Sequence, residues 1–311
     1  MKYSKPKILI ILGQTATGKS DLAIALAQKY NGAIISADSR QVYRGMDLGS
    51  GKVKRDTNSS GADFKSEGIP HYLIDIADPK KDVFTVSDFL VQAKKALKDI
   101  EQKKQLPIIC GGTGLYISAL LENWQLPKIK PNLKLRSELE TLSTNALVKK
   151  LKILDPERAK KIDLANRRRL IRSLENALQS SQPLPPLKKG RALGEFLILG
   201  LRRDNQQIKK LIALRLDKRL RLKMLEEIIT LKKTGVSSER LENFGLEYRF
   251  LNRYLEGKIT YQEMKEQLTN AIYHFAKRQN TWFKRIPNVY WFSTKKENKK
   301  AFKLVEDFLK N

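Results

Sequence analysis

The chain has 311 residues, of which 61 are Lys or Arg and 33 are Asp or Glu, so its formal net charge is +28. Domains run to roughly 100–200 residues, so this length favours one large or two modest domains. A hydrophobic fraction of 41% is enough to build a core, which excludes a wholly disordered chain. Apolar runs are too short for a membrane span or a secretory signal, and the single cysteine, Cys110, excludes a disulfide framework. We therefore expect a cytoplasmic protein with no membrane attachment.

The excess positive charge is concentrated in the second part of the chain. Residues 123–191 carry 17 basic and 6 acidic side chains, and residues 192–311 carry 26 and 14, against 18 and 13 in residues 1–122. A protein with this much surplus positive charge usually has a polyanionic partner. Nucleic acid is the first expectation and an anionic membrane the second, whereas a lysine-rich surface that serves only solubility is the alternative.

Residues 1–122 alternate short apolar segments with helical periodicity. We expect helices at 20–30 and from Ser87, where a serine can cap a helix whose apolar face runs to Ile100. Short buried strands are expected at 7–12, 33–37, 72–76 and 106–110. This alternation predicts an α/β fold with a parallel sheet flanked by helices, in which ligands bind beyond the carboxyl ends of the strands.

The pattern changes at residue 123. Residues 123–191 are helical and strongly basic, show no strand signal, and have prolines near both ends: Pro127 and Pro131, then Pro183, Pro185 and Pro186. After them we expect strands at 196–201 and 289–292 and helices at 204–234, at 260–285 and from Asn298. Residues 1–122 and 192–311 are therefore expected to form the α/β core, and residues 123–191 a helical insertion domain.

A phosphate-binding motif stands at the first expected strand–helix junction. The segment Gly13-Gln14-Thr15-Ala16-Thr17-Gly18-Lys19-Ser20 matches the pattern G-x-x-x-x-G-K-[ST]. Its glycines allow backbone N–H groups to surround phosphate oxygens, and the helix N-terminus adds partial positive charge. Lys19 would neutralise an outer phosphate, and Ser20 would offer its hydroxyl to Mg²⁺. The motif predicts a P-loop nucleoside-triphosphate-hydrolase-like core and a di- or triphosphate ligand, without saying which.

Two polar residues follow other expected strands. Asp38 comes after the strand 33–37, where a magnesium ligand or a helix cap is the ordinary interpretation, and Thr113 lies in a glycine-rich turn after the strand 106–110. Because the carboxyl ends of parallel strands meet at one edge of a sheet, Gly13, Asp38 and Thr113 are expected to converge. No arginine-rich lid stands out, so the loop could hold a diphosphate that leaves rather than a phosphate that is transferred.

Further motifs follow the phosphate loop in a fixed order. They are Ile35–Asp47 (ISADSRQVYRGMD), His71 with Asp75-Ile76 and Asp78-Pro79, Gly111–Tyr116 (GGTGLY) and Lys277–Phe283 (KRQNTWF). Together with the phosphate loop they resemble the tRNA dimethylallyltransferase family, also called tRNA isopentenyltransferases, over nearly the whole chain. Eukaryotic relatives add a zinc-finger extension, which the residues given after Phe292 are not expected to form, so a member of the bacterial type is expected.

The resemblance implies an alkyl transfer onto RNA. Members of the family move a dimethylallyl group from dimethylallyl diphosphate to N6 of adenosine 37, beside the anticodon of tRNAs that read codons starting with U. The products are N6-(dimethylallyl)adenosine and diphosphate. The resemblance therefore implies that the phosphate loop holds the diphosphate with Mg²⁺ and that the partner is the tRNA anticodon stem-loop. A monomer is expected.

By matched position, the resemblance assigns roles to five residues. Asp38 would be the general base that takes a proton from the adenine amine, a contribution of ~10²–10⁴-fold for a well-placed base. Lys19, Ser20 and Arg219 would stabilise the departing diphosphate, and Thr113 would lie near the flipped adenine.

Three stretches match the family's tRNA contacts. The pocket for the base would be lined by Asp38, Ser39, Arg40, Gln41 and Thr113. In the insertion, the contacts with phosphates of the anticodon stem would come from Arg136, Arg168, Arg169 and Arg172, although solubility alone also explains these arginines. Near the end of the long C-terminal helix, the extruded loop would meet Lys277, Arg278, Gln279 and Trp282.

The match is imperfect, and alternatives stay open. The family's usual Gly-Tyr-Arg, Thr-Arg and Gln are replaced here by Glu247-Tyr248-Arg249, Ile272-Tyr273 and Arg168. Arg215 and Arg219 share a helical face, which by itself is more typical of a solvated surface. A small P-loop kinase using ATP would leave the basic insertion unexplained. A non-catalytic RNA-binding protein would leave the joint presence of Lys19, Ser20, Asp38 and Arg219 unexplained.

Overall fold

The computed structural model describes residues 5–59, 63–127, 129, 131–180, 187–294 and 297–310. The chain forms two compact units, one of Met1–Asn123 with Arg191–Asn311 and one of Trp124–Gly190. The prolines expected to close the insertion, Pro183, Pro185 and Pro186, lie outside the described residues. None of the helices in the described ranges is long and apolar enough to cross a membrane.

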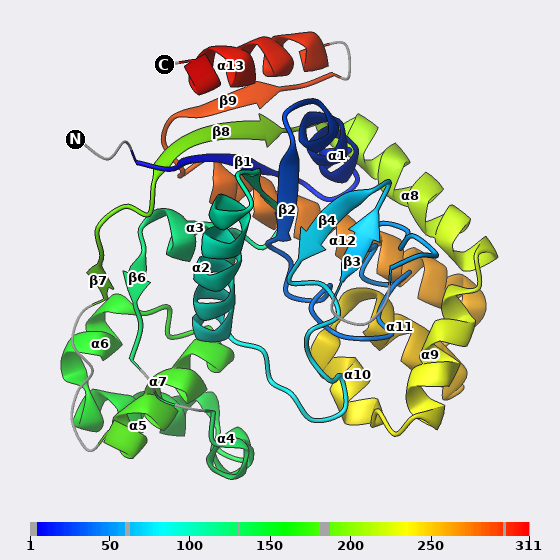
Figure 1. Ribbon diagram of the computed structural model, residues 1–311. Coiled ribbons are helices and arrows are strands. Elements are labelled where there is room, and N and C mark those ends of the chain that lie inside the picture. The colour runs from blue at the N-terminus through cyan, green and yellow to red at the C-terminus, as the bar shows by residue number, and fades with distance from the viewer. Residues whose placement is uncertain are drawn as a thin grey trace. The chain divides into compact units, whose positions relative to one another are not determined.

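The larger unit is built on a seven-stranded sheet (Figure 1). Its strands lie in the order β3-β4-β2-β5-β1-β8-β9, and every neighbouring pair is parallel except β3–β4. The strands are β1 (Lys7–Gly13), β2 (Gly32–Ser36), β3 (Phe64–Ser66), β4 (Ile69–Tyr72), β5 (Leu106–Gly111), β8 (Glu195–Leu201) and β9 (Val289–Phe292). The predicted α/β fold is confirmed, and the central strands β2 and β5 are buried throughout, as strands covered on both faces should be.

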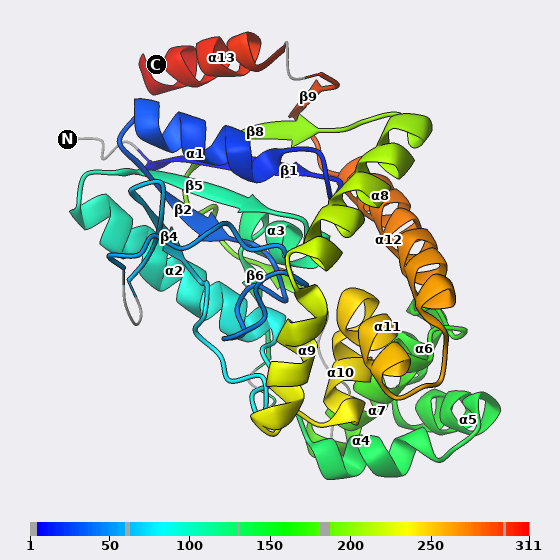
Figure 2. The same cartoon turned by 90° about the vertical axis from the view of Figure 1, so that its right-hand side faces the viewer.

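Helices cover both faces of this sheet. On one face, α1 (Lys19–Lys29) and α13 (Asn298–Lys310) share an apolar cluster with alternate residues of β1, β5 and β8. On the other face lie α2 (Val86–Gln102) and α3 (Gly114–Leu121), and α12 (Tyr261–Phe283) contacts both α3 and β1 (Figure 2). This two-sided cover leaves the carboxyl ends of the strands as the edge at which the loops gather.

Three predicted elements need correction. The cap of α2 is Thr85 rather than Ser87, because Thr85 and Asp88 form a reciprocal capping box. The strand expected at 72–76 ends at Tyr72, since Leu73 and Asp75 have φ of 64° and 56°, which no strand accommodates. The helix expected at 204–234 is two helices, α8 (Asn205–Arg221) and α9 (Met224–Lys233), separated at Lys223 with φ 72°.

Five helices and a loop form a second apolar cluster in the larger unit. The cluster joins α12 to α8, α9, α10 (Ser238–Phe244) and α11 (Leu246–Leu255). It also includes Val42, Tyr43 and Met46 from the loop after β2 (residues 37–59). The loop after β2 is therefore anchored to these helices by buried side chains.

The smaller unit is helical, as expected, but it contains one pair of strands. Its elements are α4 (Leu133–Glu140), α5 (Thr144–Leu154), α6 (Pro156–Lys161) and α7 (Arg167–Ser180), with β6 (Trp124–Gln125) antiparallel to β7 (Lys188–Lys189). The expectation of no strand is wrong here, because strands of two residues are too short to show periodicity. Leucines of α4, α5 and α7 form a core of its own: Leu139, Leu147, Leu151, Leu170 and Leu174.

Candidate active site

The phosphate loop has the backbone that its glycines permit. Gly13 has φ 144°, and a Cβ there would lie 2.0 Å from the carbonyl oxygen of Leu201 on β8. Gly18 has φ 88°, and Ala16 takes the left-handed conformation with φ 62° in spite of its side chain. The sequence folds this way because only glycine fits between β1 and β8 at the first position. The turn delivers the following residues directly into the first turn of α1.

Two side chains of the phosphate loop form hydrogen bonds with its own backbone. The carbonyl oxygen of Gln14 accepts hydrogen bonds from Thr17 Oγ1 at 2.8 Å and from Lys19 Nζ at 2.7 Å. The side chain of Gln14 accepts a further hydrogen bond from the backbone N–H of Arg203 at 3.0 Å. Lys19 is thus held within the loop in the free protein, where an anion can compete for its ammonium group.

Two arginines of α8 lie against the phosphate loop and the loop after β2. Arg215 Nη1 donates to Thr15 Oγ1 at 3.1 Å, and a Cβ on Gly51 would lie 1.7 Å from an Nη2 atom of Arg219. The side chain of Arg219 is only 12% exposed. The interpretation of this pair as a solvated surface is therefore wrong.

Burial and mutual repulsion tune these cations. Burial lowers the pKa of Lys19 to about 8; nearby Arg215 adds to the shift, and the negative charge of Asp38 opposes it. Burial also lowers the pKa of Arg215 to about 10, with the charge of Arg219 acting in the same direction. Lys19, Arg215 and Arg219 thus lie close together although burial disfavours the charged forms of Lys19 and Arg215, and such a cluster of positive charge is suited to a polyanion.

A small pocket lies between the phosphate loop and helices α8, α11 and α12. Its polar lining comes from Thr15, Arg215, Arg219 and Glu247, and its apolar lining from Ala16, Ile212, Leu216 and Ile272. Glu247 brings a carboxylate into the pocket, with Oε1 3.2 Å from Arg219 Nη1. Burial raises the pKa of Glu247, and Arg219 opposes that shift. The sequence showed that Glu247 departs from the family motif but not that it meets Arg219.

Asp38 and Thr113 lie in adjacent turns that follow β2 and β5. Asp38 Oδ1 accepts hydrogen bonds from the backbone N–H groups of Arg40 at 2.8 Å and Gln41 at 3.3 Å. Thr113 Oγ1 accepts from the N–H of Ser39 at 3.1 Å. Gly13, Asp38 and Thr113 converge as predicted, because β1, β5 and β2 are parallel neighbours and the N–H of Thr113 donates to the carbonyl oxygen of Ala37 at 3.1 Å. Asp38 caps a short turn rather than a helix, and one oxygen takes both hydrogen bonds.

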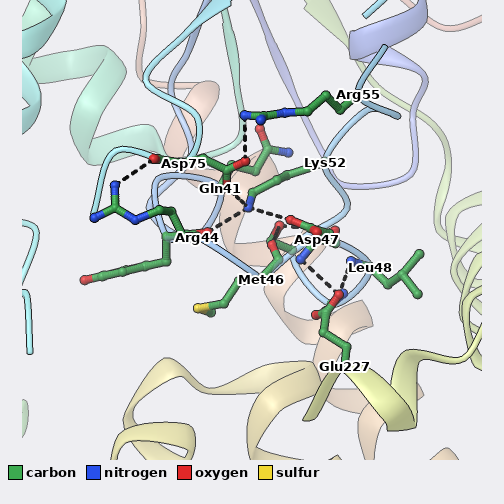
Figure 3. Close-up of polar contacts among 12 residues, drawn as sticks. Gln41, Arg44, Met46, Asp47, Leu48, Lys52, Arg55, Asp75 and Glu227 are labelled. Atoms are coloured by element: carbon green, nitrogen blue, oxygen red, sulfur yellow. Dashed lines mark hydrogen bonds and ion pairs between the residues drawn. The ribbon is translucent and has the colours of Figure 1, made fainter. Parts of the chain in front are cut away.

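The loop after β2 is fixed by two charged residues that sequence reasoning missed (Figure 3). The buried ammonium group of Lys52 donates to the carbonyl oxygen of Tyr43 at 2.7 Å, to Asp47 Oδ1 at 2.8 Å and to the carboxylate of Asp75. The carboxylate of Glu227, on α9, accepts from the successive N–H groups of residues 47, 48 and 49. The sequence motifs included the partners Tyr43, Asp47 and Asp75 of this network, but neither Lys52 nor Glu227.

The side chains of Gln279 and Trp282 on α12 contact residues that follow the carboxyl ends of β1 and β5. Gln279 Oε1 accepts from the N–H of Thr15 and its Nε2 donates to the carbonyl oxygen of Gly112, both at 2.8 Å. Trp282 Nε1 donates to Ser118 Oγ at 3.0 Å. Among the predicted tRNA contacts of this helix, Lys277 and Arg278 are exposed, whereas Gln279 is buried.

The predicted contacts of the loop after β2 are partly engaged inside the protein. Arg40 Nε donates to the carbonyl oxygen of Phe244 at 2.8 Å, and the Arg40 guanidinium lies over the Phe244 ring. Gln41 accepts from Ser36 Oγ at 2.7 Å and donates to the carbonyl oxygen of Gly51 at 3.2 Å. These two side chains therefore shape the turn that carries Asp38.

In the smaller unit, a buried carboxylate engages two of the predicted tRNA-binding arginines. Glu175 is fully buried and accepts two hydrogen bonds from Arg136, both at 3.0 Å, and another from Arg172 at 2.5 Å. Burial alone would raise the pKa of Glu175, but these arginines and the N–H of Asn132 outweigh it and lower the pKa. Arg168 and Arg169 are exposed at the start of α7. The four arginines thus fall into two pairs with different surroundings.

Comparison with known proteins agrees with this site. The sequence matches the family model for IPP transferase over residues 41–286 and that for isopentenyl transferase over residues 6–61. The tRNA dimethylallyltransferase 1 of Syntrophus aciditrophicus is 41% identical over 279 residues, which cover 90% of each chain. A solved tRNA isopentenylpyrophosphate transferase from Bacillus halodurans has a TM-score of 0.70 and 31% identity, with coverage of 98% of this chain and 97% of that one. Its counterpart from Staphylococcus epidermidis has a TM-score of 0.69 and 33% identity, with coverage of 98% and 99%. The chain therefore belongs to the IPP transferase family.

Proposed function

We propose that this protein transfers a dimethylallyl group from dimethylallyl diphosphate to N6 of adenosine 37 in tRNAs that read codons starting with U. The C–O bond to the diphosphate breaks, the C–N bond to the adenine forms, and the amine loses one proton. The products are N6-(dimethylallyl)adenosine and diphosphate. The observation that carries the proposal is the position of Asp38 at the same sheet edge as a phosphate loop surrounded by cations. We further propose that the protein is a monomer and acts in the cytoplasm.

At the diphosphate end, the task is to stabilise charge that builds on the leaving group. The N–H groups of the loop 13–20 and the start of α1 provide fixed dipoles. Lys19, Arg215 and Arg219 provide positive charge in a buried setting, where it acts more strongly than in water. Because these groups are already held in place, little reorganisation accompanies the departure of the diphosphate.

At the adenine end, the proposed base is Asp38. One of its carboxylate oxygens takes the two N–H groups of the turn, which fixes the carboxylate while the charge is shared with the second oxygen. Such a carboxylate accepts the proton that leaves N6 as the new C–N bond forms. Thr113 positions the turn that carries Asp38 through its contact with Ser39. The adenine of the tRNA must leave the stack of the anticodon loop to reach Asp38.

Mg²⁺ fits the donor set of the site. Among the described residues, no group of three His, Cys, Asp or Glu side chains could hold a metal ion by itself. Mg²⁺ commonly keeps several waters and binds through one or two protein oxygens together with substrate phosphates. The hydroxyl of Ser20, in the first turn of α1, is the protein group proposed to hold it. When bound, the ion would supply further neutralisation of the diphosphate charge.

The basic surfaces are proposed to hold the tRNA. In the smaller unit, Arg168 and Arg169 are exposed and suited to phosphate contacts, and in the larger unit Lys277 and Arg278 are exposed on α12. Arg136 and Arg172 are already paired with Glu175, so their contribution to RNA binding is expected to be smaller.

A product assay tests the proposal. The protein is incubated with Mg²⁺, dimethylallyl diphosphate and unmodified tRNA with adenosines at positions 36 to 38, and the digested RNA is examined by mass spectrometry. We expect adenosine that carries one five-carbon unit, and none when position 37 is guanosine. Transfer of phosphate from ATP, with no alkylated adenosine, would instead support a kinase. Binding of tRNA with no product from either donor would support a non-catalytic RNA-binding protein.

A further inference from the structure

Glu247 places a negative charge in a pocket otherwise built for an anion. Its side chain is 11% exposed, and Oε1 lies 3.2 Å from Arg219 Nη1. The same pocket is lined by Thr15 of the phosphate loop and by Arg215. An anion that enters this site must therefore share Arg219 with a carboxylate that the protein supplies.

Arg219 does not depend on Glu247 alone for its position. Its guanidinium is hemmed in by Gly51, where a Cβ would lie 1.7 Å from Nη2, and it approaches the carbonyl oxygen of Gly49 at 3.5 Å. The stretch that carries these glycines is held by Glu227, whose carboxylate accepts the N–H groups of residues 47 to 49 (Figure 3). Removal of the Glu247 charge would thus leave Arg219 beside the same backbone.

The geometry points to Glu247 as an internal counter-ion of Arg219 that weakens the hold of the site on diphosphate and so favours its release. A buried arginine with no partner is costly, and Glu247 removes that cost when the site is empty. When a diphosphate is bound, the same carboxylate competes with it for Arg219 and repels its negative charge. The inference rests on the proposed function, because it concerns the leaving group of that reaction, and it adds a positioning residue that controls how tightly the product is held.

Calorimetric titration with Mg²⁺ and inorganic diphosphate tests this role. In Glu247→Gln the amide oxygen can still accept a hydrogen bond from Arg219, whereas the negative charge is gone. We expect the Kd for diphosphate to fall about tenfold, which corresponds to about 1.4 kcal/mol. Product inhibition by diphosphate should strengthen by a similar factor. Both kcat and KM for dimethylallyl diphosphate should fall, because product release becomes slower and the diphosphate group of the substrate is held more tightly.

Two further variants secure the interpretation. Glu247→Ala also removes the charge and should tighten binding in the same direction, so the test does not depend on a single variant folding well. Glu242→Gln removes another partly buried carboxylate, one that pairs with Arg249 and Arg253 outside the pocket, and should leave the Kd unchanged. Thermal unfolding of each variant shows whether it is folded.

The outcomes are distinguishable. Tighter binding in both Glu247 variants, with Glu242→Gln unchanged, supports the inference. Unchanged or weaker binding in variants that fold normally overturns it, because a purely structural carboxylate would give that result, and leaves the proposed function intact. A wild-type protein that binds no diphosphate at all overturns the proposed function and this inference together.

Discussion

The side chain of Gln279 is hydrogen-bonded to the phosphate loop across 264 residues of sequence. Its Oε1 accepts from the N–H of Thr15 at 2.8 Å, while its Nε2 donates to the carbonyl oxygen of Gly112. One buried amide thus joins the loop after β1 to the loop after β5. The spacing of the two glycine-rich turns is set by a residue of α12, far from both in the sequence.

Replacement of this amide should loosen the diphosphate site. In Gln279→Ala the N–H of Thr15 and the carbonyl oxygen of Gly112 lose their partner, at a cost of about 1–3 kcal/mol for each buried group. We expect KM for dimethylallyl diphosphate to rise about tenfold and the Kd for tRNA to change less than about twofold. Steady-state kinetics and filter binding provide these values.

Two related variants refine the test. Gln279→Glu keeps the acceptor for Thr15, but it sets a carboxylate oxygen against the carbonyl oxygen of Gly112 and a negative charge beside the diphosphate site, so KM should rise at least as much as in Gln279→Ala. Thr281→Ala, at an exposed position two residues away on α12, is the matched control. A large loss of tRNA affinity with an unchanged KM for dimethylallyl diphosphate would instead favour a direct contact between Gln279 and RNA.

Asp38→Asn separates the charge of this residue from its structural contacts. The Asn side chain retains Oδ1, which accepts the N–H groups of Arg40 and Gln41, so the turn should persist. An amide is not a base, so single-turnover rates should fall by ~10²-fold or more while tRNA affinity stays within about twofold. Asp99→Asn, a surface carboxylate paired with Lys103, is the control. Near-normal turnover in Asp38→Asn would remove this residue from the proton-transfer step.

The two arginine pairs of the smaller unit should respond differently to substitution. Arg168 and Arg169 are exposed, so the double Ala variant should fold normally, weaken tRNA binding and reduce the slope of log K against log salt by about 2. Lys149→Ala with Lys150→Ala removes the same charge from α5 and is the matched control. Equal losses in both double variants would show that net charge, rather than these two positions, controls binding.

Sequence could predict the parts of the site that lie within local motifs. The loop 13–20 follows from its glycines and the flanking periodicity, and the convergence of Asp38 with Thr113 follows from the parallel sheet. The contacts of Glu247 with Arg219 and of Gln279 with Thr15 could not be predicted, because they join segments whose spacing depends on helix packing. The break at Lys223 was missed for a related reason: a left-handed residue between two apolar helices leaves the hydrophobic pattern intact.

Glu175 should make the stability of the smaller unit depend on pH. Its folded pKa lies below the ordinary value of 4.5, so its ion pairs stabilise the fold fully above that pH and are lost as pH falls through the folded pKa. Arg136 and Arg172 are 28% and 37% exposed, which reduces the cost of breaking a buried pair to about 2 kcal/mol for Glu175→Gln near pH 7.

Hydrogen exchange of residues 124–190 in the full-length protein measures this difference. Protection in Glu175→Gln should lie below wild type near pH 7. The gap should narrow as the pH falls from 4.5 through the folded pKa of Glu175, because the wild-type carboxyl group also becomes neutral below that pKa. Glu157→Gln removes an exposed carboxylate that pairs with Lys160 in the same unit, and should change protection little at either pH. Equal protection of Glu175→Gln and wild type near pH 7 would show that the shape of the Glu175 side chain, and not its charge, holds the two arginines.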